Sequence, residues 1–518
     1  MSAKILWADD EIDLLKPQIL FLEGKGYNIT PVTNGQDVLE QLSSESFDLV
    51  ILDESMPGLT GLETLDKMKD TGVQLPVIMI TKNEEEDLME QAIGQQISEY
   101  LIKPVKPQQI LSALKKIIDN KRLVSEHTNT AYQQEFQKLF LSLQEVDSYQ
   151  DWIELYRKLV FWELELAKSE GKEMHDIFTM QKSEANQAFN KFLIKNYIKW
   201  IQNPDDEDSP TMSHNLLLRK VFPLLNDDKP TVMVLIDNLR FDQWKIIQPM
   251  INSMYRMVDE EAFYSILPTA TQYSRNSIFS GLLPSEIAKQ HKEYWKNDDD
   301  EGGKNLFEKD LLGINLERSL RDPIKYQYLK IVNHRDGKAL EDNALNLLNN
   351  KLSVIVYNFV DMLSHARTEM EVLKELAGDE SAYRSITKSW FEHSSLHNAL
   401  KKISEHDVNL VITTDHGTIR VKNPSKVIGD RATTTNIRYK AGKNLNYDNK
   451  DVFEVRKPED AGLPAPNVST TYIFAKEDLY LVYPNNYNHY VNFFRNTFQH
   501  GGISLEEVII PFARYSSR

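Results

Sequence analysis

The chain has 518 residues, about three times the length of an ordinary domain, which excludes a single small module. Hydrophobic residues make up 41% and charged residues 26%, and no apolar stretch approaches the roughly 18 residues of a membrane span, so we expect a soluble protein. The acidic run Asp9-Asp10-Glu11 interrupts the region where a signal peptide would need its apolar segment. We therefore expect a cytoplasmic location.

The lack of cysteine and the acidic balance exclude further classes. Without cysteine there are no disulfides, thiolate zinc sites, iron–sulfur clusters or thiol nucleophile, so any metal must be held by oxygen and nitrogen ligands. The formal net charge of -17 disfavours a duplex-DNA binder, because such a protein neutralises phosphates with a basic face. We find no helix-turn-helix pattern after residue 120, which also argues against DNA binding.

Residues 1–120 alternate predicted strands and helices in a doubly wound α/β pattern. Short buried-strand runs cover 4–8, 48–52 and 77–80, and helical spacing covers 14–23. The three strand ends carry Asp9 with Asp10, Asp53 and Thr81. Because the carboxyl ends of parallel strands open on one crevice, these polar side chains can converge there.

This set, with Lys103-Pro104 further along, resembles the receiver domain of two-component response regulators, over about 120 residues. The resemblance implies a flavodoxin-like fold with Asp53 as phospho-acceptor and with Mg²⁺ bound by Asp10 and Asp9. It also implies that Thr81 contacts the phosphoryl group, that Lys103 pairs with it and that Tyr100 is the switch aromatic. The chemistry agrees, because a carboxylate attacks phosphorus only when cations offset the clustered negative charge.

One position departs from the receiver pattern, and two alternatives to a working receiver stay open. Glu54 follows the acceptor where an apolar residue is more usual, so we expect it to alter phosphorylation kinetics. The first alternative is a flavodoxin-like domain whose acids only cap loops. The second is a receiver that is not phosphorylated in the cell.

Residues 121–208 have few glycines or prolines, and their aromatic and leucine residues recur at helical spacing. This pattern predicts a helical bundle that connects the flanking domains. The acidic, proline-flanked stretch 203–210 reads as a loop or linker.

Residues 209–518 return to an α/β pattern. Predicted strands cover 231–236, 353–360 and 409–413, and acidic residues follow them. Two polar stretches, 296–305 and 440–466, are predicted to be surface loops or lids.

Seven dispersed residues in this part offer oxygen or nitrogen ligands: Asp237, Thr271, Asp361, His365, Asp415, His416 and His500. Taken singly, a strand-end aspartate is usually a helix cap, a histidine is usually a hydrogen-bonded or surface residue, and Thr271 reads as an N-cap. Their order, with Thr-Asp-His-Gly at 414–417, resembles the alkaline phosphatase superfamily in its PglZ-type branch, over 210–518.

That resemblance implies two Zn²⁺ ions per chain, with Mn²⁺ possible. One metal would be held by Asp237, Thr271, Asp415 and His416, and the other by Asp361, His365 and His500. Thr271 would be the catalytic nucleophile of a metal-dependent phosphoric ester hydrolase, a phosphodiesterase. Sulfatase activity is disfavoured, because the sequence around Thr271 lacks the Cys/Ser-x-Pro-x-Arg pattern of formylglycine enzymes.

One further pair of residues has the spacing of metal ligands, and one further segment has the composition of a substrate-binding site. His393 and His397 have a spacing that a metal could use, but packing or surface placement is the favoured interpretation. Arg431, Arg438, Tyr439 and Lys440 lie in a locally basic segment that would suit a nucleotide or oligonucleotide substrate. The alternatives are a solvated lid with balancing charges and lipid-linked or small phosphate esters.

The order of receiver, helical connector and PglZ domain resembles PorX-type regulators of the type IX secretion system. It implies phosphorylation by a sensor histidine kinase, binding to an extracytoplasmic-function sigma factor and to the secretion motor, and a homodimer formed on phosphorylation of Asp53. The alternative is an interaction adaptor for the sigma factor and motor, in which the metal site is structural.

Overall fold

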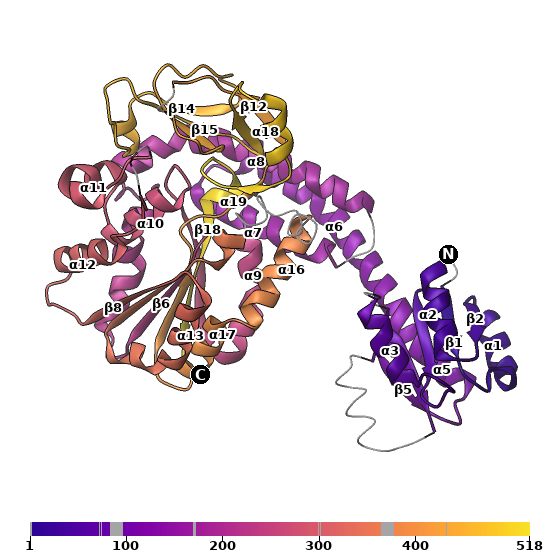
Figure 1. The fold of residues 1–518 in the computed structure, drawn as a ribbon. Helices are drawn as coiled ribbons and strands as arrows, with labels where there is room; N and C mark the ends of the chain where they lie inside the picture. Colours follow the sequence, from indigo (N-terminus) through magenta and orange to yellow (C-terminus); the bar gives the residue numbers. More distant parts are fainter. Residues whose placement is uncertain are drawn as a thin grey trace. The chain divides into compact units, whose positions relative to one another are not determined.

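A computed structural model describes residues 3–71, 73, 75–82, 97–168, 172–298, 300, 302–363, 378–430 and 433–518. The chain divides into two compact units, Met1–Gln133 with Lys168–Lys172 and Gln134–Ala167 with Glu173–Arg518 (Figure 1). Each unit has its own sheet and core, so each is described by itself.

The first unit is built on a five-stranded parallel sheet with the order β2-β1-β3-β4-β5. Its strands are β1 (Lys4–Ala8), β2 (Asn28–Val32), β3 (Leu49–Asp53), β4 (Val77–Thr81) and β5 (Glu99–Ile102). The chain reverses its winding direction between β1 and β3, which places a topological switch point at the carboxyl ends of these two strands. This order confirms the expected flavodoxin-like receiver fold.

Helices cover both faces of this sheet: α1 (Lys16–Glu23), α2 (Gly35–Ser44), α3 (Gly61–Asp70) and α5 (Pro107–Leu114). Alternate residues of β1 therefore enter two different cores, Ile5 and Trp7 on one face and Leu6 and Ala8 on the other. The helix expected over 14–23 begins two residues late, because Ile12–Leu15 form a 3₁₀ turn, η1, that leads into it.

Three long helices form the connector, which confirms the predicted helical region: α6 (Asn120–Glu145), α7 (Tyr149–Leu166) and α8 (Lys172–Gln202). Helix α7 begins at a capping box in which Ser148 and Asp151 satisfy each other's backbone N–H groups. Trp152, Leu155 and Leu159 recur on its buried face, which is the helical spacing seen in the sequence.

The large α/β domain is built on a six-stranded sheet with the order β7-β18-β10-β6-β9-β8. The parallel strands are β6 (Thr231–Ile236), β8 (Tyr326–Ile331), β9 (Leu352–Tyr357) and β10 (Asn409–Thr413). Two antiparallel pairings add β18 (Ile509–Ser516) and β7 (Arg256–Tyr264) at one edge. Strand β9 ends at Tyr357 rather than at the predicted residue 360, because residues 359–363 turn into a helix that carries Asp361.

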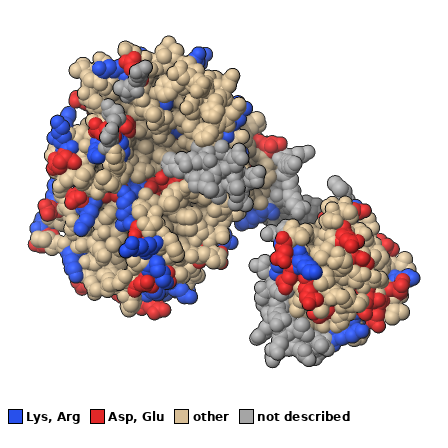
Figure 2. All heavy atoms as spheres, viewed as in Figure 1, with Lys and Arg blue, Asp and Glu red and all other residues tan. Residues whose placement is uncertain are grey.

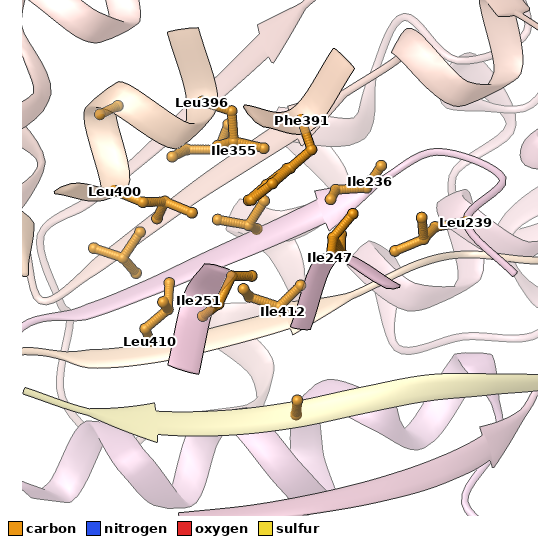
Figure 3. Packing of buried hydrophobic residues seen from close by; sticks show 14 of the residues in the cluster. Ile236, Leu239, Ile247, Ile251, Ile355, Phe391, Leu396, Leu400, Leu410 and Ile412 are labelled. Atoms are coloured by element: carbon orange, nitrogen blue, oxygen red, sulfur yellow. The ribbon is translucent and has the colours of Figure 1, made fainter. Parts of the chain in front are cut away.

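Helices pack on both faces of this sheet: α9 (Phe241–Met254), α10 (Thr271–Ser280), α11 (Pro284–Gln290), α12 (Glu308–Ser319), α13 (His334–Asp342), α16 (Glu380–Glu392), α17 (Ser395–Ile403) and α19 (Leu505–Val508). Figure 3 shows Ile247 and Ile251 of α9 and Leu396 and Leu400 of α17 around the side chains of β6 and β10. Because these strands are covered on both faces, they read as continuous apolar runs in the sequence.

Residues 419–499 form a smaller region of short strands over the large sheet (Figure 1). Its elements are β11 (Ile419–Arg420), β12 (Asn423–Lys426), β13 (Tyr439–Gly442), β14 (Val452–Val455), β15 (Thr471–Ala475), β16 (Leu479–Val482), α18 (Tyr487–Phe494) and β17 (Phe498–Gln499). The expected surface loop over 440–466 is therefore wrong in part. This segment contains most of β13 and all of β14, and both strands pair with β15. Val452 and Val455 of β14 are buried.

Short 3₁₀ and π segments complete the chain: η2 (Lys115–Asp119), η3 (Ser213–Asn215), η4 (Leu217–Val221), η5 (Phe222–Asn226), η6 (Lys292–Tyr294), η7 (Ala344–Asn349) and η8 (Pro458–Ala461). Among the described residues, no helix has both the length and the apolar character needed to cross a bilayer.

Buried ion pairs join the connector to the large domain. Lys182 of α8 lies 2.8 Å from Glu163 of α7 and 2.9 Å from Glu506 at the start of α19. Arg384 of α16 completes the cluster, 2.8 Å from Glu163 and 3.1 Å from Asp242. Because these groups are largely removed from water, each charge depends on its partners for stabilisation.

Lys182→Met tests this dependence. The substitution leaves Glu163 and Glu506 without their shared cation, so we expect the free energy of unfolding to fall by about 3 kcal/mol. Urea unfolding followed by tryptophan fluorescence measures this, since all tryptophans except Trp7 lie beyond residue 133. Lys191→Met, at an exposed position of α8, is the matched control. Equal stabilities of the two variants would contradict the interpretation.

Candidate functional site

The receiver site lies at the carboxyl ends of β1 and β3. Asp9 and Asp53 are both fully buried, and the Lys103 ammonium lies 2.8 Å from Asp9 Oδ2 and 3.0 Å from Asp53 Oδ2. Exposed Asp10 brings a third carboxylate, and oxygens of the three acids lie within 4.8 Å of one another. Burial raises the pKa of the Asp53 carboxyl, against the opposing effect of Lys103.

This geometry fits a divalent cation and a phosphoryl group. Asp53 Oδ1 is buried and accepts no hydrogen bond from the described residues. A buried carboxylate oxygen without a donor is costly, and carboxylates are the ligands that Mg²⁺ prefers. The structure thus brings together four of the predicted receiver residues, Asp9, Asp10, Asp53 and Lys103.

Thr81 and Tyr100 occupy the neighbouring strands. Thr81 is the buried last residue of β4, and its carbonyl accepts a hydrogen bond from the backbone N–H of Lys103 at 2.7 Å. Tyr100 is half-buried on β5, opposite Met79 in the register with β4. Thr81 therefore lies on the strand next to β3, whereas Tyr100 lies one strand further from the acidic site.

Glu54 has a structural role that the sequence did not reveal. Its Oε2 accepts a hydrogen bond from the backbone N–H of Leu62 at 2.9 Å, so it caps the first turn of α3. A Cβ on Gly61 would lie 2.7 Å from the Asp53 carbonyl and 2.8 Å from Glu54 Oε2, which explains the glycine. Burial raises the pKa of Glu54.

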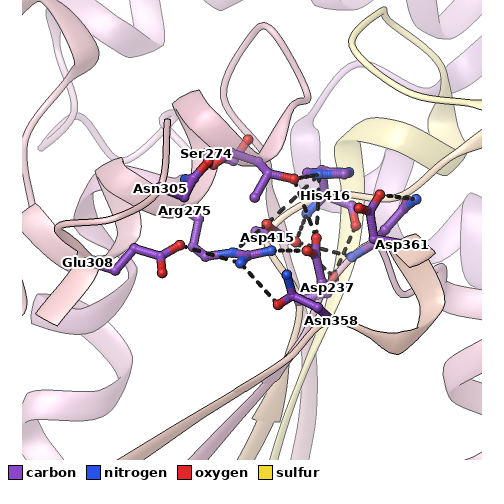
Figure 4. Close-up of polar contacts among 12 residues, drawn as sticks. Asp237, Ser274, Arg275, Asn305, Glu308, Asn358, Asp361, Asp415 and His416 are labelled. Atoms are coloured by element: carbon purple, nitrogen blue, oxygen red, sulfur yellow. Dashed lines mark hydrogen bonds and ion pairs between the residues drawn. The ribbon is translucent and has the colours of Figure 1, made fainter. Parts of the chain in front are cut away.

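In the large domain, four of the predicted metal ligands lie together at the ends of β6 and β10 and the start of α10 (Figure 4). Asp237, Asp415 and His416 are buried and can each offer a ligand atom within 4.8 Å of the others. Thr271, the first residue of α10, has its hydroxyl 3.0 Å from His416 Nε2 and 3.4 Å from Asp237 Oδ1.

Two residues predicted for the second metal lie beside this group. His500 Nε2 is 3.7 Å from Asp361 Oδ1, and the rings of His416 and His500 stack with their centroids 4.3 Å apart. Asn238 bridges the two sets, since its Nδ2 donates to Asp361 Oδ1 at 3.4 Å. The third predicted ligand, His365, lies outside the described residues.

His393 and His397 do not share one helix. His393 ends α16, where its Nδ1 lies 2.8 Å from the Ser389 carbonyl, whereas His397 belongs to α17. Ser394 between them caps α17 through the backbone N–H of His397. Their spacing therefore marks a junction between two helices, in line with the favoured interpretation that they are not ligands.

Local packing explains why the loops after β6 and β10 hold their residues close together. The Asn238 N–H donates to Asp415 Oδ1 at 3.2 Å, and the Leu239 N–H donates to Thr414 Oγ1 at 3.0 Å. A Cβ on Gly417 would lie 1.9 Å from the carbonyl oxygen of Glu506. The glycine of the Thr-Asp-His-Gly motif is thus required by a close approach of two backbones.

Arg275 and Glu308 belong to the site, and the sequence analysis missed both. Arg275 is fully buried, and its guanidinium contacts Asp237 and lies 2.9 Å from Asp415 Oδ2. Burial alone would raise the pKa of Asp415, but Arg275 and His416 lower it to about 2. The sequence offered one indication of this role: Arg275 follows Thr271 by one helical turn, so both side chains lie on the same face of the predicted helix.

Comparison with known families agrees with this geometry. A family model for the BREX system PglZ alkaline phosphatase-like domain matches residues 216–515, more than half of the chain. The chain belongs to the PglZ family. A model for the PorX response regulator linker domain matches residues 122–201, and one for the response regulator receiver domain matches residues 5–115. The chain therefore has the domain order of a PorX-type response regulator, which confirms the resemblance.

Individual relatives match a smaller part of the chain. The alkaline phosphatase synthesis transcriptional regulatory protein PhoP of Bacillus subtilis is 28% identical over 120 residues, 23% of this chain and 49% of PhoP. The response regulator SaeR of Staphylococcus epidermidis is 31% identical over 137 residues, 26% of this chain and 59% of SaeR. The chain thus spans about half the length of the curated relatives it matches.

Solved structures of receiver domains also match. A response regulator receiver domain protein from Clostridium thermocellum is 32% identical, with a TM-score of 0.22, and the match covers 23% of this chain and 98% of that one. A CheY-like receiver domain protein from Methanospirillum hungatei is 25% identical, with a TM-score of 0.22, over 23% of this chain and 96% of that one.

The PglZ domain does not present the predicted substrate-binding residues as an exposed basic surface. Arg438 is fully buried, with Nη2 2.6 Å from Glu507 Oε2, and Lys440 is buried with Nζ donating to the Thr434 carbonyl at 3.1 Å. Tyr439 is also buried, and its hydroxyl donates to Asp298 at 3.1 Å. The expectation is wrong because β13 pairs with β15 and its side chains are covered. Arg431 lies outside the described residues.

Figure 2 shows Lys and Arg side chains interspersed with acidic ones on the visible face of the PglZ domain. The described part of this face therefore has no continuous basic surface of the kind that a nucleic-acid binder presents.

Lys440 makes a testable contribution to stability. Burial lowers its pKa to about 7, whereas an unfolded lysine titrates near ~10.4. Between these values the unfolded chain binds more protons, so the stability of the wild type rises with pH across this window. At pH 7.5 the buried amine has largely lost its proton, which costs free energy on folding; Lys440→Met removes this cost, and we expect it to raise the free energy of unfolding by roughly 2 kcal/mol.

Urea unfolding at pH 7.5 and pH 10 measures the effect, because the gain should shrink at the higher pH. The control is Lys443→Met, at an exposed position next to β13. A gain from Lys440→Met that is absent at pH 7.5, or equal at both values, would contradict the assigned pKa.

Proposed function

We propose that this chain is a two-component response regulator, phosphorylated on Asp53, whose PglZ domain is a zinc-dependent phosphodiesterase that regulates type IX secretion. The observation that carries the enzymatic proposal is the meeting of Thr271 with Asp237, Asp415 and His416, beside Asp361 and His500. A nucleophile at a helix N-terminus, among oxygen and nitrogen ligands, is what phosphoryl transfer needs.

The donor set fits two divalent cations. Asp237, Asp415, His416 and the Thr271 hydroxyl would hold one, and Asp361, His500 and His365 would hold the other. Carboxylate and imidazole donors suit Zn²⁺, with Mn²⁺ as the alternative, and the acidic receiver site suits Mg²⁺. When bound, the paired cations would lower the pKa of the Thr271 hydroxyl and stabilise negative charge on the reacting oxygens.

The chain's own groups then divide the work. Thr271 Oγ1 attacks phosphorus, which forms a phosphothreonine and expels the alkoxide of the ester; the proton lost by the threonine passes to that alkoxide, which leaves as the alcohol. A water molecule next attacks the same phosphorus, which frees phosphate or a phosphomonoester and restores the threonine. The N-terminus of α10, which begins at Thr271, would favour the negative charge of the phosphoryl oxygens.

Nucleotides or oligonucleotides are the proposed substrates. Since Arg438 and Lys440 are buried, the support comes from a cavity of about 240 Å³ that begins at α10. Tyr273, Tyr472 and Lys443 are among the residues that line it. The rings suit contact with a base and Lys443 suits a phosphate, while Asp298 and Asp430, which also line the cavity, would accept hydrogen bonds from substrate hydroxyl or amino groups.

Thr271→Val tests the nucleophile. The variant lacks the hydroxyl but keeps the volume, so we expect turnover of a chromogenic phosphodiester to fall more than ~100-fold. We expect the variant to keep its bound metal, because only the threonine ligand is lost. Elemental analysis of the same samples should give two zinc ions per wild-type chain.

Thr387→Val is the control, because Thr387 is a buried threonine of α16 whose hydroxyl bonds to Tyr383 and Gln243, away from the site. Wild-type turnover in Thr271→Val would reject Thr271 as nucleophile. Purified protein without zinc or manganese, and without activation by either, would reject the metal-dependent enzyme.

The proposed regulation starts in the cytoplasm with a sensor histidine kinase that phosphorylates Asp53. The phosphate adds about -1.5 to -2 charge beside Lys103 and Thr81, which favours a rearrangement of the adjoining surface and a homodimer. By resemblance to PorX-type regulators, the further partners are an extracytoplasmic-function sigma factor and the secretion motor.

Asp53→Asn tests this step. We expect wild-type protein to incorporate phosphate from a small acyl phosphate and then to reach the mass of a dimer in solution, because the Asp53 carboxylate is buried and paired with Lys103. Asp53→Asn should do neither. Asp48→Asn, an exposed position just before β3, should behave as wild type. Phosphate uptake by Asp53→Asn, or no mass change in the phosphorylated wild type, would contradict the proposal.

An interaction adaptor is the second candidate function. Apolar side chains on all three connector helices are exposed, among them Leu141 at 56%, Phe161 at 55% and Met180 at 56%. An adaptor with a structural metal site would keep normal secretion in Thr271→Val. If the reaction product regulates secretion, Thr271→Val would instead lose normal secretion.

A further inference from the structure

Arg275 lies against both carboxylates that are proposed to hold one metal. It is fully buried in α10, with Nη2 on Asp237 Oδ2 and Nε 2.9 Å from Asp415 Oδ2. On its other side, Nη1 lies 3.4 Å from both Glu308 Oε1 and Asn358 Oδ1. Every edge of the planar guanidinium therefore has an oxygen partner.

The contacts leave one oxygen of Asp237 directed to the reacting groups. Arg275 contacts Asp237 Oδ2, while Asp237 Oδ1 lies 3.4 Å from the Thr271 hydroxyl. Figure 4 shows Arg275 and Glu308 on one side of Asp237 and Asp415, and Asp361 on the other. The guanidinium thus approaches the carboxylates from the side away from the second metal-binding set.

Asp415 is held from both ends as well. Its Oδ1 accepts from the backbone N–H groups of Asn238 at 3.2 Å and His416 at 3.1 Å, and its Oδ2 accepts from Arg275. A carboxylate with hydrogen bonds to both oxygens cannot rotate freely. Its orientation is set before any cation arrives.

Glu308 holds Arg275 in turn. It is buried at the start of α12, where its Oε2 lies 2.5 Å from the Tyr328 hydroxyl and 2.7 Å from the Lys330 ammonium. Both donors come from β8, so the arginine is anchored to the sheet through Glu308. Arg275 and Lys330 thus bring two positive charges to the three buried carboxyl groups of Asp237, Asp415 and Glu308.

We infer that Arg275, anchored by Glu308, is a positioning residue that orients Asp237 and Asp415 and thereby raises their affinity for the metal. The inference rests on the proposed function, in which these carboxylates are ligands. A group that hydrogen-bonds to a metal ligand fixes its orientation, and loss of such a group typically weakens metal binding by about 10- to 100-fold.

Arg275→Lys separates this role from charge alone. Lysine keeps the positive charge, but its single ammonium cannot replace a planar fork that reaches two carboxylates and Glu308. We expect zinc affinity, measured by competition with a chelator, to fall at least about 10-fold. We also expect a changed visible spectrum of the cobalt-loaded protein, because that spectrum depends on ligand geometry. The kcat should fall with little change in KM.

Glu308→Gln provides a second variant of nearly the same shape, and it should weaken zinc binding in the same direction. Arg384→Lys is the matched control, since Arg384 is also a buried, ion-paired arginine but contacts Glu163 and Asp242 instead of metal ligands. It should keep wild-type zinc affinity and the wild-type cobalt spectrum. Tryptophan fluorescence checks that each variant is folded.

The outcomes separate the inference from the proposed function. Unchanged or tighter zinc binding in folded Arg275→Lys and Glu308→Gln, with normal binding by the wild type, overturns the positioning role only. A wild type that binds neither zinc nor cobalt overturns the proposed metal enzyme and the inference together. A 10-fold loss in Arg384→Lys as well would show a general packing effect and would also overturn the positioning role.

Discussion

Buried carboxylates at the ends of parallel strands are the constraint on which the PglZ site depends. Because β6 and β10 run side by side, their carboxyl ends bring Asp237 and Asp415 to one place in the interior. Two such charges repel each other and have lost their water, so the fold must supply positive charge there. Arg275 supplies part of it, through its ion pairs with Asp237 and Asp415.

The receiver meets the same constraint with different residues. Asp9 and Asp53 end neighbouring strands, both are buried, and Lys103 lies within 3.0 Å of each. The positive charge here comes from Lys103, whose ammonium is a compact charge at the end of a flexible chain. In the PglZ domain it comes from a rigid arginine fork anchored by Glu308. The two domains thus stabilise neighbouring buried carboxylates in different ways, the receiver with a flexible lysine and the PglZ domain with a planar arginine whose position is fixed by Glu308.

The sequence predicted the strands well and the interior charges poorly. The strands 4–8, 231–236 and 409–413 have the predicted bounds, because a strand covered on both faces must be apolar throughout. Asp361 and the short strands β13 and β14 were placed less well, since their packing partners are distant in the chain. The sequence could not show that Arg438, Lys440 and Arg275 are buried. A basic residue that faces solvent and one that pairs with a buried acid look the same in a sequence, because the pairing depends on distant parts of the chain.

The connector is part of the packing of the PglZ domain. Glu506 pairs with Lys182 of α8 through its side chain, while its carbonyl lies against Gly417, next to His416. Asn186 of α8 adds a hydrogen bond to Glu506 Oε2 at 3.1 Å and accepts one from the Leu505 N–H at 2.8 Å. A shift of α8 would therefore have to move Glu506, leave a buried charge unpaired, or alter the loop that carries His416. The place of this helix and the geometry of the loop that carries His416 are fixed by the same contacts.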